Sequence, residues 1–169
     1  MFRLKNLDIK QIPLSQGLFA LVDDEDFEEL NKYKWYAYKS RNAFYAGRKL
    51  RLGVNKRQII VMHRQILGLE DPNIKGDHID HNGLNNQRYN LRPSTNAENT
   101  RNQKPKKGYS SKYKGVCWHK RDEKWNATIF AENKKKHLGY FTNEIEAAKA
   151  YDAAAKIYFK EFSCLNFKD

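Results

Sequence analysis

The sequence has few cysteines and no long apolar segment. Its two cysteines, Cys117 and Cys164, lie far apart and form no CxxC pair, which argues against both a structural zinc site and a disulfide framework. No apolar run approaches the roughly 20 residues that span a bilayer, and residues 1–5 lack the apolar stretch of a signal peptide. We therefore expect a soluble, cytoplasmic protein that binds no membrane.

Acidic residues are few and concentrated in one segment. The chain of 169 residues has 20 Asp and Glu against 32 Lys and Arg, a formal net charge of +12. Such a chain is attracted to nucleic acid. Six of the acids lie between Asp23 and Glu29. We interpret them as the solvated start of a helix, favoured there by the helix dipole, with a metal site as the weaker alternative; DNA should avoid this face.

The first sixty residues predict a small α+β region whose role the sequence does not indicate. Apolar and aromatic runs separated by turn residues are typical of short strands, and the acidic segment should cap a helix. The expected elements are a strand at 17–22, a helix at 24–33 and strands at 35–38, 43–51 and 58–62, followed by a helical turn at 63–69.

The last third of the chain predicts a three-stranded antiparallel sheet and one helix. Residues 105–110 are rich in Lys, Pro and Gly and indicate a basic linker. Three strands are expected at 113–120, 124–131 and 135–141, joined by hairpins. Asn143 and Glu146 form a capping-box pattern, and apolar residues then recur at helical spacing up to Phe159.

The middle of the chain groups a carboxylate, an imidazole and amides within a short stretch. Asp77 and His78 end a polar strand, which must bend if both side chains are to serve one site. Thr95 and Glu98 stand in capping-box register, so a helix should begin near Thr95 and carry Asn99. Carboxylate and amide oxygens suit a hard divalent cation, and a histidine can accept a proton from water. The pattern predicts a strand, strand, helix hairpin around one metal ion.

This central segment resembles the HNH endonucleases with a ββα-metal fold, in particular the homing endonucleases of phages and bacteria. The residues that carry the resemblance are Asp77-His78, Asn85-Asn86, Asn90-Leu91-Arg92 and Glu98-Asn99. It implies that Asp77 and Asn99 bind Mg²⁺ or Mn²⁺, with no zinc, and that His78 is the general base. Asn90 would brace the loop that carries His78. Asn99 stands where the family name has His, a variant common in the homing branch.

The C-terminal region resembles a second family, the APETALA/ethylene-response-factor (ERF) DNA-binding domains. The matching pieces are residues 111–116, Trp125, residues 138–141, 146–148, 150–154 and 165–167. In that family one face of the sheet lies in the major groove. The positions expected to face DNA are Lys114, Cys117, His119, Lys124, Thr128, Phe130, Lys135 and His137. Cys117, His119 and Phe130 stand where the plant proteins usually place Arg, so the plant target sequence should not transfer.

These resemblances imply an α+β chain with four regions: an N-terminal region 1–60, an HNH nuclease core 61–104, the linker 105–110 and a DNA-binding domain 111–169. The function they imply is site-specific hydrolysis of double-stranded DNA with one divalent metal, leaving a 3′-hydroxyl and a 5′-phosphate. The protein would act as a monomer or homodimer in the cytoplasm of a bacterial cell or phage-infected host. A non-cleaving transcriptional regulator and a structural RNA-binding protein are the alternatives.

Several residues keep more than one interpretation. His81 could replace His78 as the base, although the family register favours His78. His63 is expected to pack or to contact the DNA backbone rather than to bind metal. Arg88 and Arg92 are the best candidates for phosphate contacts beside the hairpin. The aromatic residues of the C-terminal sheet, Trp118, Trp125, Tyr140 and Phe141, could stack on bases but are expected mainly in the core.

Overall fold

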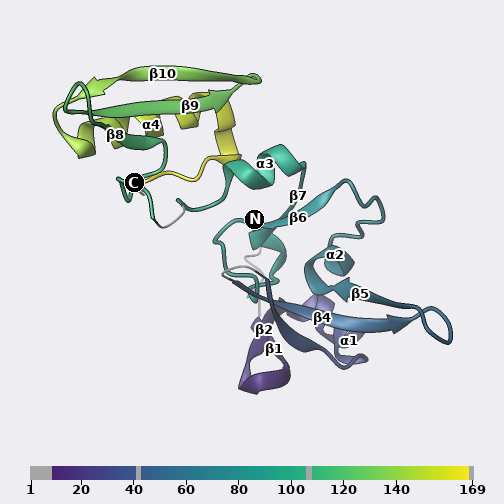
Figure 1. Cartoon of the computed structure of the whole chain (residues 1–169). Coiled ribbons are helices and arrows are strands. Elements are labelled where there is room, and N and C mark those ends of the chain that lie inside the picture. The colour runs from purple at the N-terminus through teal and green to yellow at the C-terminus, as the bar shows by residue number, and fades with distance from the viewer. Residues whose placement is uncertain (1–8, 41–42, 106–107, 168–169) are drawn as a thin grey trace, which may run out of the picture. The chain divides into compact units, whose positions relative to one another are not determined.

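The computed structural model describes residues 9–40, 43–105 and 108–167. The chain divides into two compact units, an N-terminal unit, Met1–Asn96, and a C-terminal unit, Ala97–Asp169. Both combine short sheets with few helices (Figure 1), so the fold class is α+β, as predicted. Among the helices of the described residues, none has both the length and the apolar character needed to cross a bilayer.

The N-terminal unit contains three small antiparallel sheets. β1 pairs with β2, β4 lies between β3 and β5, and β6 pairs with β7. The strands are β1 (Ile9–Pro13), β2 (Phe19–Asp23), β3 (Tyr36–Ser40), β4 (Ala43–Arg51), β5 (Arg57–Val61), β6 (Lys75–His78) and β7 (Leu91–Ser94). The helical segments are η1 (Ser15–Gly17), α1 (Asp24–Asn31), α2 (Met62–Ile66) and η2 (Arg88–Asn90).

One apolar core holds these sheets together. It is formed by buried side chains of the first two strands, α1, β4 and α2, and it includes Trp35, whose ring nitrogen donates to the Leu30 carbonyl at 2.8 Å. Leu91 brings β7 into the same core. Burial of side chains from elements far apart in the sequence therefore fixes β7, and with it the paired strand β6, to the N-terminal strands.

The C-terminal unit is a three-stranded sheet packed on one long helix, after the short helix α3 (Asn96–Arg101), which begins at the last residue of the N-terminal unit. The order is β8 (Val116–His119), β9 (Lys124–Ala131) and β10 (Lys134–Phe141), with α4 (Glu144–Phe159) and η3 (Lys160–Phe162) after them. As predicted, Asn143 caps α4, its side chain accepting from the Ile145 amide at 2.7 Å.

Gly115 shows how closely the first strand approaches α4. Its φ is +77°, and a Cβ built there would lie 1.9 Å from the ring of Tyr151. Only glycine fits, because it has no Cβ and adopts positive φ without strain. Apolar residues of β9 and of α4 complete the core on that face of the sheet.

The expected strands and helices are present, with two differences in the N-terminal unit. β1 was not predicted, because Ile12 is its only buried residue and the segment shows no alternation. Asp23 occupies the N-cap position of α1, but its side chain makes no capping hydrogen bond. The prediction that Asp23 belongs to a solvated, capping group of acids is therefore wrong: its side chain is 2% exposed and bonds elsewhere in the unit.

Candidate functional site

Asp77 and His78 lie at the end of β6, and both are buried, with 5% and 6% of their surface exposed. Strand pairing sets Asp77 opposite Arg92 and His78 opposite Leu91. Arg92 donates to Asp77 Oδ2 from Nε and from a terminal nitrogen, at 2.9 and 2.8 Å. The buried carboxylate thus has a cationic partner, which a buried charge needs. Arg92, predicted to contact phosphate, is bound to the predicted metal ligand.

The loop after His78 is held by Asn90 and Asp80. The Asn90 side chain accepts from the Asp80 amide and donates to Asp80 Oδ1, both at 2.9 Å, and the Asn90 carbonyl accepts from the Ile79 amide. Burial alone raises the pKa of Asp80, but hydrogen bonds from Asn82, Asn85 and Asn90 outweigh it and lower that pKa. These are the bonds that the predicted bracing role of Asn90 requires.

Asn86 fixes the orientation of the His78 ring. This asparagine is fully buried, and its Nδ2 donates to the Leu84 carbonyl at 3.2 Å. Its Oδ1 then faces His78 Nε2, at 3.4 Å. Because an amide oxygen only accepts, the partner nitrogen Nε2 carries the hydrogen and Nδ1 is the basic nitrogen of the neutral ring.

Two further rings enclose His78. The His63 ring meets it edge to face at a centroid distance of 4.8 Å, and Tyr45 of β4 lies 5.8 Å away. Burial lowers the pKa of His63 to about 3 and also lowers that of His78, so that both imidazoles are neutral near pH 7. His63 therefore packs in the site, as expected. Gly76 makes room for it, because a Cβ there would lie 2.2 Å from the His63 ring.

Strand β2 anchors the same loop from the N-terminal region. The Leu21 amide donates to the Leu84 carbonyl at 2.8 Å, and the Leu21 carbonyl accepts from the Asn86 amide at 2.7 Å. Asp23 then accepts from Gln87 Nε2 at 3.0 Å and from the Arg88 amide at 2.8 Å. The first sixty residues, to which the sequence assigned no role, thus support the loop that orients His78.

Arg88, which was expected to contact DNA, pairs with acidic side chains of α1. Its guanidinium donates to both oxygens of Asp26 at 2.7 and 2.8 Å and lies 2.7 Å from Glu25. The acids of α1 thereby hold the end of the loop. His81, the alternative base, adopts a positive φ of 67° in the turn after His78, and its amide donates to the His78 carbonyl at 3.1 Å.

Asn99, the second predicted metal ligand, lies in α3 and is half-buried. It belongs to the C-terminal unit, whereas Asp77 belongs to the N-terminal unit. Within the described residues, no three His, Cys, Asp or Glu side chains gather in a way that could hold a metal ion. The donor types nevertheless fit Mg²⁺ or Mn²⁺, since a carboxylate offers about four lone-pair positions and an amide oxygen is also a hard ligand.

The C-terminal sheet carries most of the predicted DNA-binding residues on one face. Pairing sets His119 opposite Lys124, Thr128 opposite His137, and Phe130 opposite Lys135. Residues directly opposite in a sheet point to the same side. Cys117 lies on this face as well, whereas the intervening residues of β9 are buried towards α4. The side chain of Phe130 is 66% exposed, so the face presents an aromatic group together with cations.

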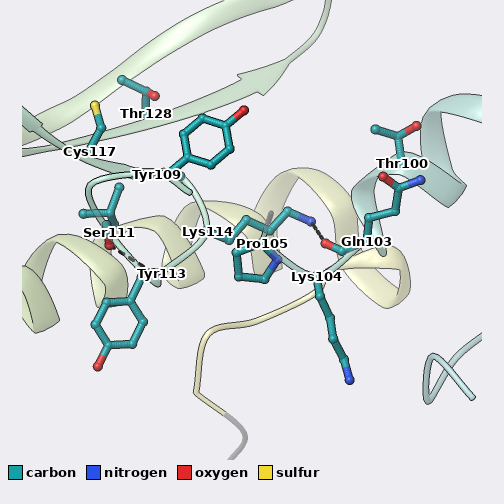
Figure 2. A pocket seen from close by; sticks show the side chains of 12 residues that line it. Thr100, Gln103, Lys104, Pro105, Tyr109, Ser111, Tyr113, Lys114, Cys117 and Thr128 are labelled. Carbon is teal, nitrogen blue, oxygen red and sulfur yellow. Dashed lines mark hydrogen bonds between the residues drawn. The ribbon is translucent and has the colours of Figure 1, made fainter. Parts of the chain in front are cut away.

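Lys114 is the exception among these positions. It precedes β8, and its Nζ donates to the backbone carbonyl of Arg101 and to that of Gln103, the second of which Figure 2 shows. Burial lowers its pKa. The expectation that Lys114 faces DNA is corrected, since its ammonium holds the end of α3 and the following segment. It also lines a pocket of about 340 Å³ with Tyr109 and Cys117.

On this face one residue was missed by the sequence analysis and another was expected mainly in the core. Asn126 pairs with Cys117 on one side and Tyr140 on the other, and its buried Oδ1 has no hydrogen-bond partner. The alternation from Lys124 to Phe130 could have identified it. Tyr140, expected in the core, is 43% exposed and packs against His137 and His119 at centroid distances of 4.7 and 5.3 Å. Trp118 is also 38% exposed, whereas Trp125 and Phe141 pack on the core.

Three known proteins are similar in sequence to this chain. An uncharacterized HNH endonuclease of Acanthamoeba polyphaga mimivirus is 33% identical over 156 residues, which cover 89% of this chain and 76% of the relative. An AP2/ERF and B3 domain-containing transcription factor of Arabidopsis thaliana is 42% identical over 60 residues, 36% of this chain and 17% of that protein. Protein 3.8 of Escherichia phage T7 is 44% identical over 59 residues, 35% and 49% of the two chains. No family model matches.

Proposed function

The chain belongs to the HNH endonuclease family, and on that premise we propose that it is a site-specific, homing-type endonuclease that cuts double-stranded DNA. The observation that carries the proposal is the buried pair of Asp77 and His78 at the end of β6, with the His78 ring oriented by Asn86. A neutral imidazole held in one tautomer can accept the proton of a water that attacks phosphorus.

His78 is the general base of the proposed reaction. With Nε2 hydrogen-bonded to Asn86, its Nδ1 accepts the proton of the attacking water. Burial lowers the pKa of His78, which keeps the imidazole neutral and able to accept that proton at neutral pH. Asn90 holds the loop behind the ring through its bonds to Asp80 and Ile79. The expected products are a 3′-hydroxyl and a 5′-phosphate.

Asp77 and Asn99 would hold the divalent cation, Mg²⁺ or Mn²⁺. When bound, such an ion neutralises negative charge that grows on the phosphate and on the leaving oxygen. Arg92 fixes the buried Asp77 side chain in place through hydrogen bonds to Oδ2. In this proposal Arg92, which binds Asp77, also contacts the substrate phosphate once DNA is bound.

The C-terminal sheet supplies the choice of site in this proposal. Its exposed face carries Lys124, Lys135, His137 and Phe130, which can contact phosphates and bases. The similarity to the Arabidopsis transcription factor supports DNA binding by such a module. A chain that used this face without cutting would be a transcriptional regulator, and cleavage assays distinguish the two functions.

The proposal is tested with His78→Ala. We expect this variant to bind duplex DNA as the wild type does and to cleave supercoiled plasmid roughly 10²-fold to 10⁴-fold more slowly in Mg²⁺, the contribution of a general base. His81→Asn is the matched control, because asparagine tolerates the positive φ of that position. Chelator should stop cleavage by the wild type. Equal cleavage by wild type and His78→Ala would refute the assignment of the base.

A further inference from the structure

The sheet formed by β3, β4 and β5 comes from a part of the chain without acids. The forty residues from Leu30 to Leu69 contain ten Lys and Arg and no Asp or Glu. Of the flanking acids of α1, Glu29 pairs with Lys32, which lies in this stretch but before the sheet, and Asp26 pairs with Arg88. A sheet with this composition has a positive potential that its own segment does not compensate, and it attracts a polyanion.

The outer half of β4 and β5 is a two-stranded ribbon. β3 pairs only with Ala43–Gly47 of β4, so the four residues from Arg48 to Arg51 pair with β5 alone. In this ribbon Arg51 lies directly opposite Arg57. Like charges facing each other across strands destabilise a sheet, and a phosphate between the two guanidinium groups would remove that repulsion.

The turn that closes the ribbon, Leu52–Lys56, exposes apolar side chains between the cations. We call this segment the hairpin tip; the Leu52 amide closes it by donating to the Lys56 carbonyl at 2.8 Å. Val54 is 85% exposed and Leu52 is 49% exposed. Figure 1 shows the tip projecting past the other elements of the N-terminal unit. Exposed apolar residues on such a projection indicate a surface that binds a partner.

Duplex DNA fits this pattern of apolar centre and cationic flanks. A groove presents base edges at its floor, including thymine methyl groups, between two rows of phosphates, and the major groove admits a two-stranded ribbon. Apolar side chains at a protein's tip also enter between base steps in the minor groove. In either groove Val54 would reach the bases, while Arg51 and Arg57 on the two strands would reach the flanking phosphates.

The ribbon shares a sheet face with the candidate active site. Alternation along β4 places Arg51, Lys49 and Tyr45 on one side, and the Tyr45 ring lies against His78. Six residues separate Tyr45 from Arg51, about 20 Å of extended strand at roughly 3.3 Å per residue. At about 3.4 Å per nucleotide, that distance corresponds to roughly six base pairs of DNA.

We propose that the hairpin tip enters a groove of the DNA substrate about six base pairs from the scissile phosphate, with Arg51 and Arg57 on the phosphates beside it. This inference rests on the proposed function, because it assumes that duplex DNA is the substrate. The surface is distinct from the C-terminal sheet, and it gives the N-terminal unit a DNA contact of its own.

The test is binding of a mixed-sequence duplex by the full chain in chelator, where no cleavage occurs. Arg51→Gln combined with Arg57→Gln should weaken binding and reduce the slope of log K against log salt by about 1.8, because two guanidinium groups no longer neutralise phosphates. Val54→Asn should weaken binding with the slope unchanged. The charge-matched control is Lys10→Gln with Lys32→Gln, whose ammonium groups face Asp24 and Glu29; its slope should stay at the wild-type value.

The inference is wrong if the salt slope and the DNA affinity of the arginine double variant equal those of the wild type. It is also wrong if the double variant differs from the wild type only in its sedimentation, because the tip would then be a contact between two copies of the chain. Once a cut site is mapped, hydroxyl-radical footprints of the double variant should lose protection about six base pairs from it. A wild type that binds but never cuts in Mg²⁺ would refute the proposed function alone, since the binding data decide this inference separately.

Discussion

The contact between Asp23 and the loop after His78 gives the sharpest prediction of stability. In Asp23→Ala the Gln87 amide group and the Arg88 backbone amide both lose their acceptor. Each hydrogen bond to a carboxylate contributes about 1.5–3 kcal/mol, so the two together contribute about 3–6 kcal/mol. Asp23 is 2% exposed, and water does not replace the missing acceptor without opening the structure. We expect this variant to be severely destabilised in the N-terminal unit.

Asp24→Ala is the control for that prediction, because it removes the neighbouring carboxylate. The Asp24 side chain is 64% exposed and lies 3.5 Å from Lys10, a surface pair that contributes less than about 1 kcal/mol. Hydrogen exchange on the full chain should show Asp23→Ala losing protection at residues 84–88 and Asp24→Ala keeping it. Cleavage should fall in parallel with protection. Similar exchange in the two variants would refute the reasoning that β2 holds this loop.

Three further outcomes follow from other contacts. Asn86→Ala frees the ring of the base to change tautomer, and plasmid cleavage should fall roughly 10-fold to 100-fold with DNA binding unchanged. Gly115→Ala drives a Cβ into the Tyr151 ring and should lower the free energy of unfolding, measured by thermal melts, by about 2–5 kcal/mol. Gly108→Ala should cost less, because its Cβ would meet no atom within 4 Å. Hydrogen bonds outweigh burial and lower the pKa of Asp80 below its ordinary 3.8. The ionised Asp80 carboxylate therefore stabilises the fold fully above pH 3.8, and this contribution is lost as the pH falls through the lower pKa of the folded state. In Asp80→Asn the free energy of unfolding should depend less on pH in this acidic range.

The sequence predicted elements and shared faces better than it predicted partners. The alternation of β9 correctly grouped Thr128 and Phe130, because a side-chain period of two is a property of any strand. Tyr140 was misplaced because the register of β10 shifts between His137 and Gly139. The extra residue moves Tyr140 to the opposite face from the one that simple alternation gives. Such a bulge has no strong signal in a single sequence.

Long-range polar contacts were the other limit. Lys114 binds backbone carbonyls, which every residue has, so no side-chain pattern could identify its partners. Asp23 lies in a run of acids that looks like an ordinary helix start, and only the fold brings Gln87 within reach. Local capping at Asn143, by contrast, was predictable, since the donor follows two residues later. Predictability thus decreased with the sequence separation of the partners.

That separation also orders events during synthesis. Asp23 precedes its partners Gln87 and Arg88 by 64 and 65 residues. At about 5–20 residues per second, a ribosome needs roughly 3–13 seconds to make that interval. The anchor strand β2 is therefore complete well before the loop that it holds, and a nascent chain stopped before Asn86 has no oriented His78 ring. Translation itself thus delays assembly of the candidate site until the loop at residues 84–88 has also been made.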